Sequence, residues 1–252
     1  MPQKSKIEWT EISWNPVTGC HKIGPGCDHC YAERFAERFR GVPGHPYEVG
    51  FDLTLRHDRL SLPVQWRRPK VIFVNSMSDL FHKGIPRSYV DRVFETMEAA
   101  DWHVFQVLTK RSTLMRDYIN RRHGTGLAPR HIWLGVSVEN KQARSRVRHL
   151  QEVNAQIRFI SAEPLLEDLG DIDLDGIHWL IAGGESGAGA RPMKFQWACG
   201  LRNRCQTSGT AFFFKQWVPT ATTANAGQRK PMGGCSKAGF GTRCPRFDEG
   251  RH

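Results

Sequence analysis

Three cysteines lie close together near the start of the chain, at positions 20, 27 and 30, in a stretch rich in glycine and proline. Thiolates are soft ligands, so three of them in one short loop favour an iron–sulfur cluster or zinc. Gly24 and Gly26 allow the backbone to curl so that all three sulfurs face inward. The sequence therefore predicts a metal centre with Cys20, Cys27 and Cys30 as its ligands.

Two other interpretations of these cysteines are weighed against a cluster. Disulfides are disfavoured because the chain has seven cysteines, an odd number, and shows no signal peptide, so we expect a reducing cytoplasm. A structural zinc site needs a fourth ligand, which His21 or His29 can supply. Cys27 and Cys30 form one C-x2-C pair, which is half of the usual zinc pattern. The spacing favours a cluster and leaves zinc as the alternative.

Length and charge limit the class of protein. The 252 residues are enough for one large domain with a substantial core. No apolar run approaches the ~20 residues needed to span a membrane, so we expect no membrane contact. The formal net charge of +11 favours a polyanionic partner, but the basic residues are spread along the whole chain. Charge therefore points towards nucleic acid or a nucleotide without locating a binding surface.

Short apolar runs alternate with segments of helical period along most of the chain. A first strand is expected within residues 7–19, and further strands at 70–75, 103–108, 132–136, 157–160, 177–181 and 211–214. Helices are expected after Cys30, from Pro86, around 114–119, through 143–150 and near 195–206. Such alternation predicts βαβ units and a mainly parallel sheet. We expect a partial or complete (β/α) barrel with a cysteine loop after its first strand, with a doubly wound open sheet as the alternative.

The barrel is expected to occupy residues 1–218. Residues 219–252 are dominated by glycine, proline, threonine, lysine and arginine without a hydrophobic period, so we expect an irregular basic tail there. Cys205 shares a helix face with Trp197 and Leu201, which favours core packing, whereas Cys199 has no assigned role. A second metal site at Cys235 and Cys244, in the tail, is a minor alternative.

Each expected strand ends on polar residues, at the edge where barrel enzymes place their chemistry. These strand-end residues are Asn75, Ser76, Ser78, Asp79, Lys110, Arg111, Ser137, Glu139, Asn140, Glu163, Gly183, Gly184, Glu185 and Lys215. The three cations, Lys110, Arg111 and Lys215, are candidates for holding a phosphate or carboxylate at the mouth of the barrel. The alternative for each polar residue is loop chemistry or helix capping, and for Gly183-Gly184 a phosphate-cradling turn.

Several motifs taken together resemble one known group of proteins. They are Trp14–Cys20, Cys27–Ala32, Asn75–Asp79, Gly183–Gly187 and Phe213–Trp217. The chain resembles the three-cysteine-motif proteins of phages and bacteria, a family of unknown function. That family is similar to the radical S-adenosylmethionine (SAM) enzymes and distantly similar to spore photoproduct lyase. The resemblance covers about residues 7–218.

The resemblance implies a barrel of radical SAM type that holds a [4Fe–4S] cluster on the three cysteines, with SAM on the fourth iron. The cofactor-binding residues it implies are Asn75, Ser76, Ser78, Asp79, Ser137, Gly183, Gly184 and Glu185. The catalytic candidates are Asp79, Glu139, Glu163, Glu185 and Lys215. The implied reaction modifies or repairs a nucleic acid base or a nucleotide, and it needs an electron donor. A partner protein encoded nearby is also compatible with the resemblance.

The chain departs from the radical SAM pattern in three places, and the first is the residue before the third cysteine, which is usually aromatic and is His29 here. Its cysteines are spaced C-x6-C-x2-C, whereas that superfamily usually has C-x3-C-x2-C. Gly183-Gly184-Glu185 lies much later than the superfamily's glycine-glycine-glutamate signature, and Asn75–Asp79 stands in the signature's position. Two other functions are therefore kept. One is an iron–sulfur enzyme that uses its open iron as a redox or Lewis-acid centre without SAM. The other is a zinc- or cluster-stabilised nucleic-acid-binding protein without catalysis.

Overall fold

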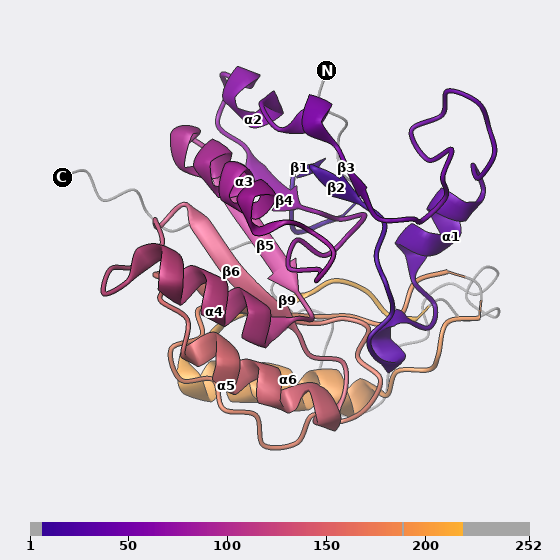
Figure 1. Ribbon diagram of the computed structural model, residues 1–252. Helices are drawn as coiled ribbons and strands as arrows, with labels where there is room; N and C mark the ends of the chain where they lie inside the picture. Colours follow the sequence, from indigo (N-terminus) through magenta and orange to yellow (C-terminus); the bar gives the residue numbers. More distant parts are fainter. Residues whose placement is uncertain (1–6, 188, 219–252) are drawn as a thin grey trace.

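The computed structural model describes residues 7–187 and 189–218, and its centre is one curved sheet of seven parallel strands (Figure 1). From edge to edge the strands are β1 (Ile12–Trp14), β4 (Val71–Val74), β5 (Val104–Thr109), β6 (Ile132–Ser137), β7 (Arg158–Ala162), β8 (Trp179–Ala182) and β9 (Ala211–Phe214). Their order across the sheet follows their order along the chain, and every neighbouring pair is parallel. A doubly wound sheet reverses its order at a switch point. The expected partial (β/α) barrel is therefore confirmed.

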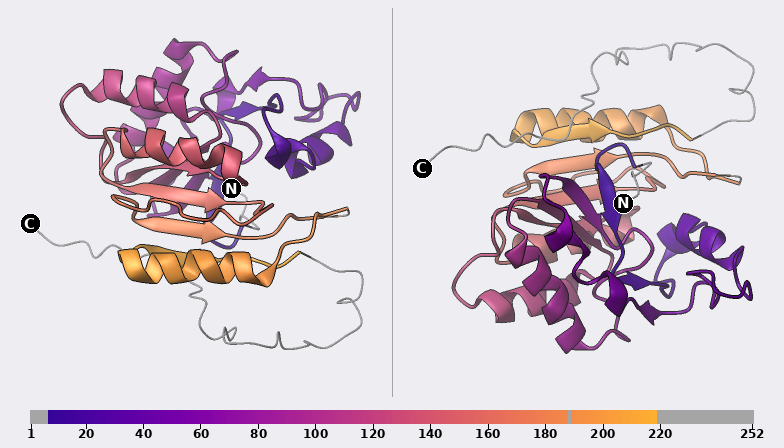
Figure 2. Two further views of the ribbon diagram at one scale, coloured as in Figure 1. Left: turned by 90° about the horizontal axis from the view of Figure 1, so that it is seen from below. Right: turned by 90° about the horizontal axis from the view of Figure 1, so that it is seen from above.

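Helices cover the outer face of this sheet (Figures 1 and 2). The longer ones are α3 (Arg87–Ala99), α4 (Ser112–His123), α5 (Ser145–Gln151) and α6 (Phe195–Ser208). The apolar period predicted for α3 is the face that it buries, with Val90, Val93, Phe94 and Met97 in the core. These side chains pack against outward-facing strand residues, including Ile72 and Val74 of β4. No helix in the described part of the chain is long and apolar enough to cross a membrane.

The segment between β1 and β4 holds the shorter elements. They are β2 (Val17–Thr18), η1 (Pro25–Cys27), α1 (Tyr31–Glu37), β3 (Thr54–Leu55), η2 (His57–Arg59) and α2 (Leu62–Gln65), while η3 (Lys141–Arg144) precedes α5. Helix α1 buries Ala32 and Ala36 against Met77, whereas Tyr31 and Phe35 are exposed. Two small side chains on one face let α1 lie close to the loop that follows β4.

Aromatic side chains fill the inside of the barrel towards the amino ends of the strands. Trp9, from the segment before β1, packs its ring against those of Phe73, Phe159 and Trp179, with ring centroids 4.7, 6.5 and 6.1 Å away. Side chains alternate along a strand, so β6 points Trp133 inward and then Gly135 and Ser137. The shift from large to small inward residues leaves open space at the carboxyl ends of the strands.

Gly135 occupies a position where no side chain fits. A Cβ atom built on it would lie 2.5 Å from the ring of Phe159 on the neighbouring strand. We therefore expect Gly135→Ala to lower the free energy of unfolding by about 1–3 kcal/mol, the usual effect of overpacking. Denaturant titration measures it, with Gly200→Ala in α6 as the matched control. Nothing lies within 4 Å of a Cβ atom at Gly200, so the control should gain roughly 0.5–1 kcal/mol of helix stability. Equal stability of Gly135→Ala and wild type would contradict this packing.

Candidate functional site

A cavity of about 240 Å³ opens at the carboxyl ends of the strands, below the cysteine loop, residues 20–30. The deeper part of its wall is apolar and includes Trp9, Phe73 and Leu108. The structure brings most of the predicted site residues to this cavity: Cys20, Cys27, Cys30, Asn75, Ser76, Ser78, Asp79, Lys110, Arg111, Ser137, Glu163, Gly184, Glu185 and Lys215. Glu139 and Gly183 do not line the cavity, but each adjoins a residue that does. Glu139 pairs with Lys110, and Gly183 precedes Gly184.

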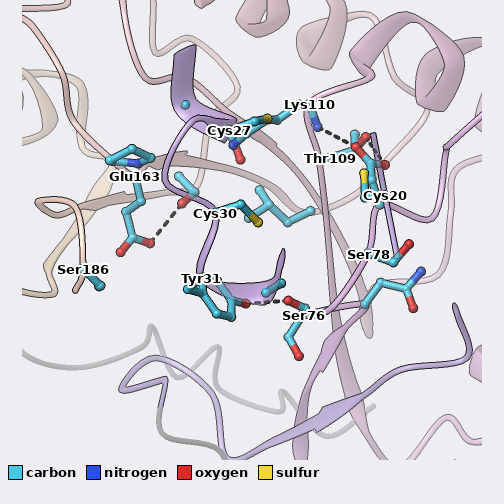
Figure 3. A pocket seen from close by; sticks show the side chains of 18 of the residues that line it. Cys20, Cys27, Cys30, Tyr31, Ser76, Ser78, Thr109, Lys110, Glu163 and Ser186 are labelled. Atoms are coloured by element: carbon cyan, nitrogen blue, oxygen red, sulfur yellow. Dashed lines mark hydrogen bonds between the residues drawn. The ribbon is translucent and has the colours of Figure 1, made fainter. Parts of the chain in front are cut away.

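The three cysteine side chains surround one space, as Figure 3 shows. All three are free thiols and partly exposed. Within the described residues, no three or more histidine, cysteine, aspartate or glutamate side chains are grouped to hold a single metal ion. In a [4Fe–4S] cluster each thiolate binds a different iron, so thiols spread around a shared space suit a cluster. Three thiols around one space are a donor set that suits an iron–sulfur cluster, and a zinc ion would need a fourth ligand in addition.

The histidines considered as a fourth zinc ligand have other neighbours. Nδ1 of His29 donates to Oε2 of Glu185 at 2.9 Å. Nδ1 of His21 lies 2.7 Å from Nε2 of His82, and the two rings stack. Outside the cysteine loop, Cys205 is buried in the core on α6, as its helical period predicted. Cys235 and Cys244 lie outside the described residues, as does the rest of the expected tail.

Asp79 is buried and holds four hydrogen-bond donors of the protein. Its Oδ1 accepts from the Thr109 hydroxyl at 2.7 Å and from the backbone N–H of Phe81 at 3.0 Å. Its Oδ2 accepts from the backbone N–H of Lys110 at 3.2 Å and from Nη1 of Arg111 at 2.8 Å. The carboxylate thus joins the loop after β4 to the end of β5, and it is occupied by protein donors.

Arg111 connects Asp79 to the first half of the cysteine loop. Its Nη1 lies 3.5 Å from the sulfur of Cys20, and its Nη2 donates to the backbone oxygen of His21 at 3.0 Å. Burial raises the pKa of the Cys20 thiol, and the nearby Arg111 guanidinium opposes this without reversing it. The Asp79–Arg111 pair therefore fixes both the position and the electrostatic surroundings of Cys20.

Glu185 and Arg191 hold the second half of the loop in a similar way. Glu185 is buried, and its carboxylate accepts from Nη2 of Arg191 at 2.5 Å, from the Arg191 backbone N–H at 2.9 Å and from His29. Arg191 also donates to the backbone oxygen of Pro25 at 2.8 Å and pairs with Asp28 at 3.3 Å. Burial alone would raise the pKa of Glu185, but hydrogen bonds from Arg191 and His29 outweigh it and bring the pKa to about 2.

Three further ion pairs lie at the strand ends around the cavity. Nζ of Lys110 lies 2.6 Å from Oε1 of Glu139, and Arg146 binds the other oxygen of Glu139 at 2.8 Å. Burial would raise the pKa of Glu139, but Lys110 and Arg146 overcome it and hold the pKa below its usual value. Nζ of Lys215 lies 3.0 Å from Oε1 of Glu163. Lys110, Arg111 and Lys215, the cations expected to hold a phosphate, are thus each paired with a carboxylate of the protein.

The loop after β4 is tied to the loop after β1. The hydroxyl of Ser76 donates to Oδ1 of Asn15 at 3.2 Å, and that of Ser78 donates to the backbone oxygen of Gly19 at 2.6 Å. Asn75 adopts a left-handed backbone conformation, with φ at 60°. Its buried Nδ2 has no hydrogen-bond partner among the described residues. Asn75 therefore offers an unused donor in the wall of the cavity, whereas Ser78 serves the protein backbone.

Gly183 and Gly184 pack against the end of β9. A Cβ atom on Gly184 would lie 2.8 Å from the backbone nitrogen of Val218, so glycine permits this close approach. The N–H of Gly183 donates to the carbonyl of Ala162, and that of Gly184 donates to the carbonyl of Gln216. Both N–H groups are engaged within the sheet edge, so the alternative of a phosphate-cradling turn is not supported here.

The site contains several residues that the sequence did not indicate. Arg191 and Arg146 each bind a predicted carboxylate, yet Arg191 lies after the Gly183–Gly187 motif and Arg146 lies at the start of α5. Tyr31 lines the cavity and donates to the backbone oxygen of Ser76 at 2.5 Å. Ser161, which donates to Glu163 at 3.0 Å, could have been found because its strand ends at the predicted edge.

The seven sequential parallel strands form a partial (β/α) barrel, and three cysteines line the cavity at its carboxyl edge. Spore photoproduct lyase shares this fold: its structure complexed with dinucleoside spore photoproduct has a TM-score of 0.51. That structure and one of a cysteine-to-serine mutant are each 12% identical to the chain, and the matches cover 87% of this chain and 79% of each of those chains. The chain belongs to the family described as "Protein of unknown function (DUF5131)", whose profile matches residues 4–240. A comparison with curated proteins found no match.

The Glu185–Arg191 pair predicts a pH-dependent contribution to stability. A carboxylate with a lowered pKa stabilises the fold above its unfolded pKa of about 4.3, and this contribution is lost as the pH falls towards the folded value of about 2. We expect Glu185→Gln to lower the free energy of unfolding at pH 7 by up to about 3 kcal/mol. The difference from wild type should shrink as the pH falls through that window.

Urea titrations at several pH values measure this difference. Glu95→Gln is the matched control, because Glu95 is exposed on α3 and should show no comparable effect. A difference between Glu185→Gln and wild type that stays constant from pH 7 to about 2 would mean that the carboxylate charge does not stabilise the loop.

Proposed function

We propose that this protein is a [4Fe–4S] enzyme of the radical SAM type that modifies or repairs a base of a nucleic acid or nucleotide. One observation carries the proposal: Cys20, Cys27 and Cys30 line a single cavity at the carboxyl edge of a partial barrel. The edge is where barrel folds place their chemistry, and the three free thiols fit a cluster with one iron left without a protein ligand.

The bound cluster would supply one-electron cleavage of SAM, which yields a carbon radical able to take a hydrogen atom from a substrate; the electron comes from an external donor. The chain's own part is to bind, orient and exclude water. The rings of Trp9 and Phe73 close the deep end of the cavity, and the cysteine loop covers its mouth. This arrangement would limit the access of water to a reactive intermediate.

The cavity wall offers a small set of groups for SAM and the substrate. The unused amide donor of Asn75 and the hydroxyl of Ser137 are proposed as direct contacts. Ser76, Glu163 and Lys215 lie along the same wall and are proposed to meet the ligand, with the Glu163–Lys215 pair able to hold or move a proton. Glu139 is proposed to act through Lys110.

The remaining expected ligand contacts are proposed to act on the protein instead. Ser78, Asp79 and Glu185 hold the cysteine loop, and Gly183-Gly184 keeps the end of β8 against β9. This division follows from the contacts already made by each group. A carboxylate with four protein donors, such as Asp79, has little capacity left for a ligand.

Nucleic acid or a nucleotide is proposed as the substrate class for two reasons. The net charge is +11, and the fold is that of a lyase whose structure holds a dinucleoside photoproduct. A base inside a duplex must leave its stack to enter a barrel, at a cost of a few kcal/mol. Single-stranded or damaged nucleic acid therefore suits this cavity best.

Anaerobic reconstitution with iron and sulfide tests the cluster. Wild type should bind about four irons per chain and absorb near ~400 nm, and Cys27→Ser should lose both because one of three thiolate ligands is gone. Cys199→Ser on α6 is the matched control, since Cys199 does not line the cavity. Adding SAM and a reductant to wild type should then release 5′-deoxyadenosine.

Each result separates the proposal from its alternatives. Full iron content in Cys27→Ser would contradict the ligand assignment. An intact cluster that yields no 5′-deoxyadenosine would favour the SAM-independent iron–sulfur enzyme. Zinc in place of iron in the purified protein would favour the binding protein without catalysis.

Titration of a labelled oligonucleotide tests the substrate class. We expect a single strand to bind more tightly than the matching duplex, with log affinity falling by about 0.7 per contacted phosphate for each unit of log salt. The dependence should come from exposed basic residues, because Lys110 and Lys215 are already paired with Glu139 and Glu163. Weak binding that does not respond to salt would point to a free nucleotide or another small molecule.

A further inference from the structure

We propose that Arg111 is a positioning residue of the metal centre, which holds Cys20 in place and raises the reduction potential of the cluster through a hydrogen bond to the Cys20 sulfur. The inference rests on the proposed function, because it concerns the cluster that the three cysteines would hold. It assigns to Arg111 a part other than the phosphate binding that the sequence indicated.

The geometry around Arg111 is that of an anchored donor. Its side chain is largely buried, with 9% exposed. Nη1 lies 2.8 Å from Oδ2 of Asp79 and 3.5 Å from Sγ of Cys20, and Nη2 lies 3.0 Å from the oxygen of His21. A guanidinium presents its N–H groups in a rigid planar fork, so three contacts in different directions fix its orientation.

The anchor behind Arg111 is itself held firmly. Asp79 receives Thr109, Phe81 and Lys110 as donors in addition to Arg111. A carboxylate that is fully hydrogen-bonded by protein groups is fixed in place. Its remaining effect is to aim the Arg111 guanidinium at the cysteine loop.

A cationic donor at a cluster sulfur has a predictable effect on redox chemistry. Hydrogen bonds to the sulfurs are among the factors that set the potential of an iron–sulfur cluster. Reduction adds negative charge to the cluster, and a neighbouring cationic donor stabilises the reduced, more negative state. The interaction is stronger in a partly buried site than in water. Of the three cysteines, Cys20 is the one whose sulfur Arg111 contacts. We therefore expect Arg111 to change the potential through its interaction with the Cys20 sulfur.

The Glu185–Arg191 pair provides an internal control. Arg191 binds the backbone oxygen of Pro25 at 2.8 Å and the carboxylate of Asp28 at 3.3 Å. Both arginines therefore hold the loop. Among the interactions given above for these two side chains, the one with a cysteine sulfur is that of Arg111 with Cys20. Comparing the two separates holding the loop from tuning the cluster.

The experiment compares reconstituted wild type with Arg111→Met, Arg111→Lys and Arg191→Met. The readouts are iron content, the electron paramagnetic resonance signal of the reduced cluster and its midpoint potential in a redox titration. We expect Arg111→Met to have a lower potential than wild type, and Arg111→Lys to lie between them because it keeps the charge without the fork. Arg191→Met also removes a cation that holds the loop but leaves the contact with Cys20 in place, so its potential should fall less than that of Arg111→Met.

The outcomes distinguish this inference from the proposed function. A wild type that binds no iron–sulfur cluster overturns both. A cluster with the same potential in wild type, Arg111→Met and Arg111→Lys overturns the inference alone. If Arg111→Met fails to hold a cluster, the potential of Arg111→Lys decides: a lower value supports the inference, and the wild-type value overturns it.

Discussion

The site depends on two ion pairs with buried carboxylates that hold the cysteine loop across the mouth of the barrel. Asp79 with Arg111 holds the loop at Cys20 and His21, and Glu185 with Arg191 holds it at Pro25 and Asp28. The carboxylates follow β4 and β8, so the loop spans several strands of the sheet. Removing one partner of a buried pair leaves an uncompensated charge and is strongly destabilising. The shape of the cavity follows from these four side chains.

The barrel supplies the space that the loop covers. Aromatic rings occupy the amino ends of the strands, and small inward residues such as Gly135 and Ser137 follow towards the carboxyl ends. Trp9 is the link between the two parts, since it packs in the aromatic cluster and also lines the cavity. An enclosed apolar depth below a polar rim is the usual form of a small-molecule site. The change from large to small inward side chains along the strands therefore places the cavity at the carboxyl end of the barrel.

The strands and the barrel were predictable because they depend on local patterns. The six apolar runs from 70–75 onward all form strands within two residues of the expected bounds, and their alternation with helices indicated a mainly parallel sheet. The partners of the strand-end residues were not predictable, because Asp79 meets Arg111 and Glu185 meets Arg191 only after distant strand ends converge. Helix α1 shows the same limit: Tyr31 and Phe35 recur four residues apart, as on one helix face, yet the buried residues of α1 are Ala32 and Ala36. The hydrophobic period of a sequence predicts which residues lie on the same face of a helix or strand. It does not predict which residues from other parts of the chain pack against that face.

The structure gives a role to the six residues between Cys20 and Cys27, where the radical SAM superfamily usually has three. The extra residues between Cys20 and Cys27 include η1 and the carbonyl of Pro25, which Arg191 grips. The loop is thus shaped by hydrogen bonds that need no metal, unlike that of a zinc finger, which is unfolded without its ion. If the three cysteines hold the proposed cluster, its assembly would then be a step separate from folding, because the contacts of Arg191 with Pro25 and Asp28 form without it.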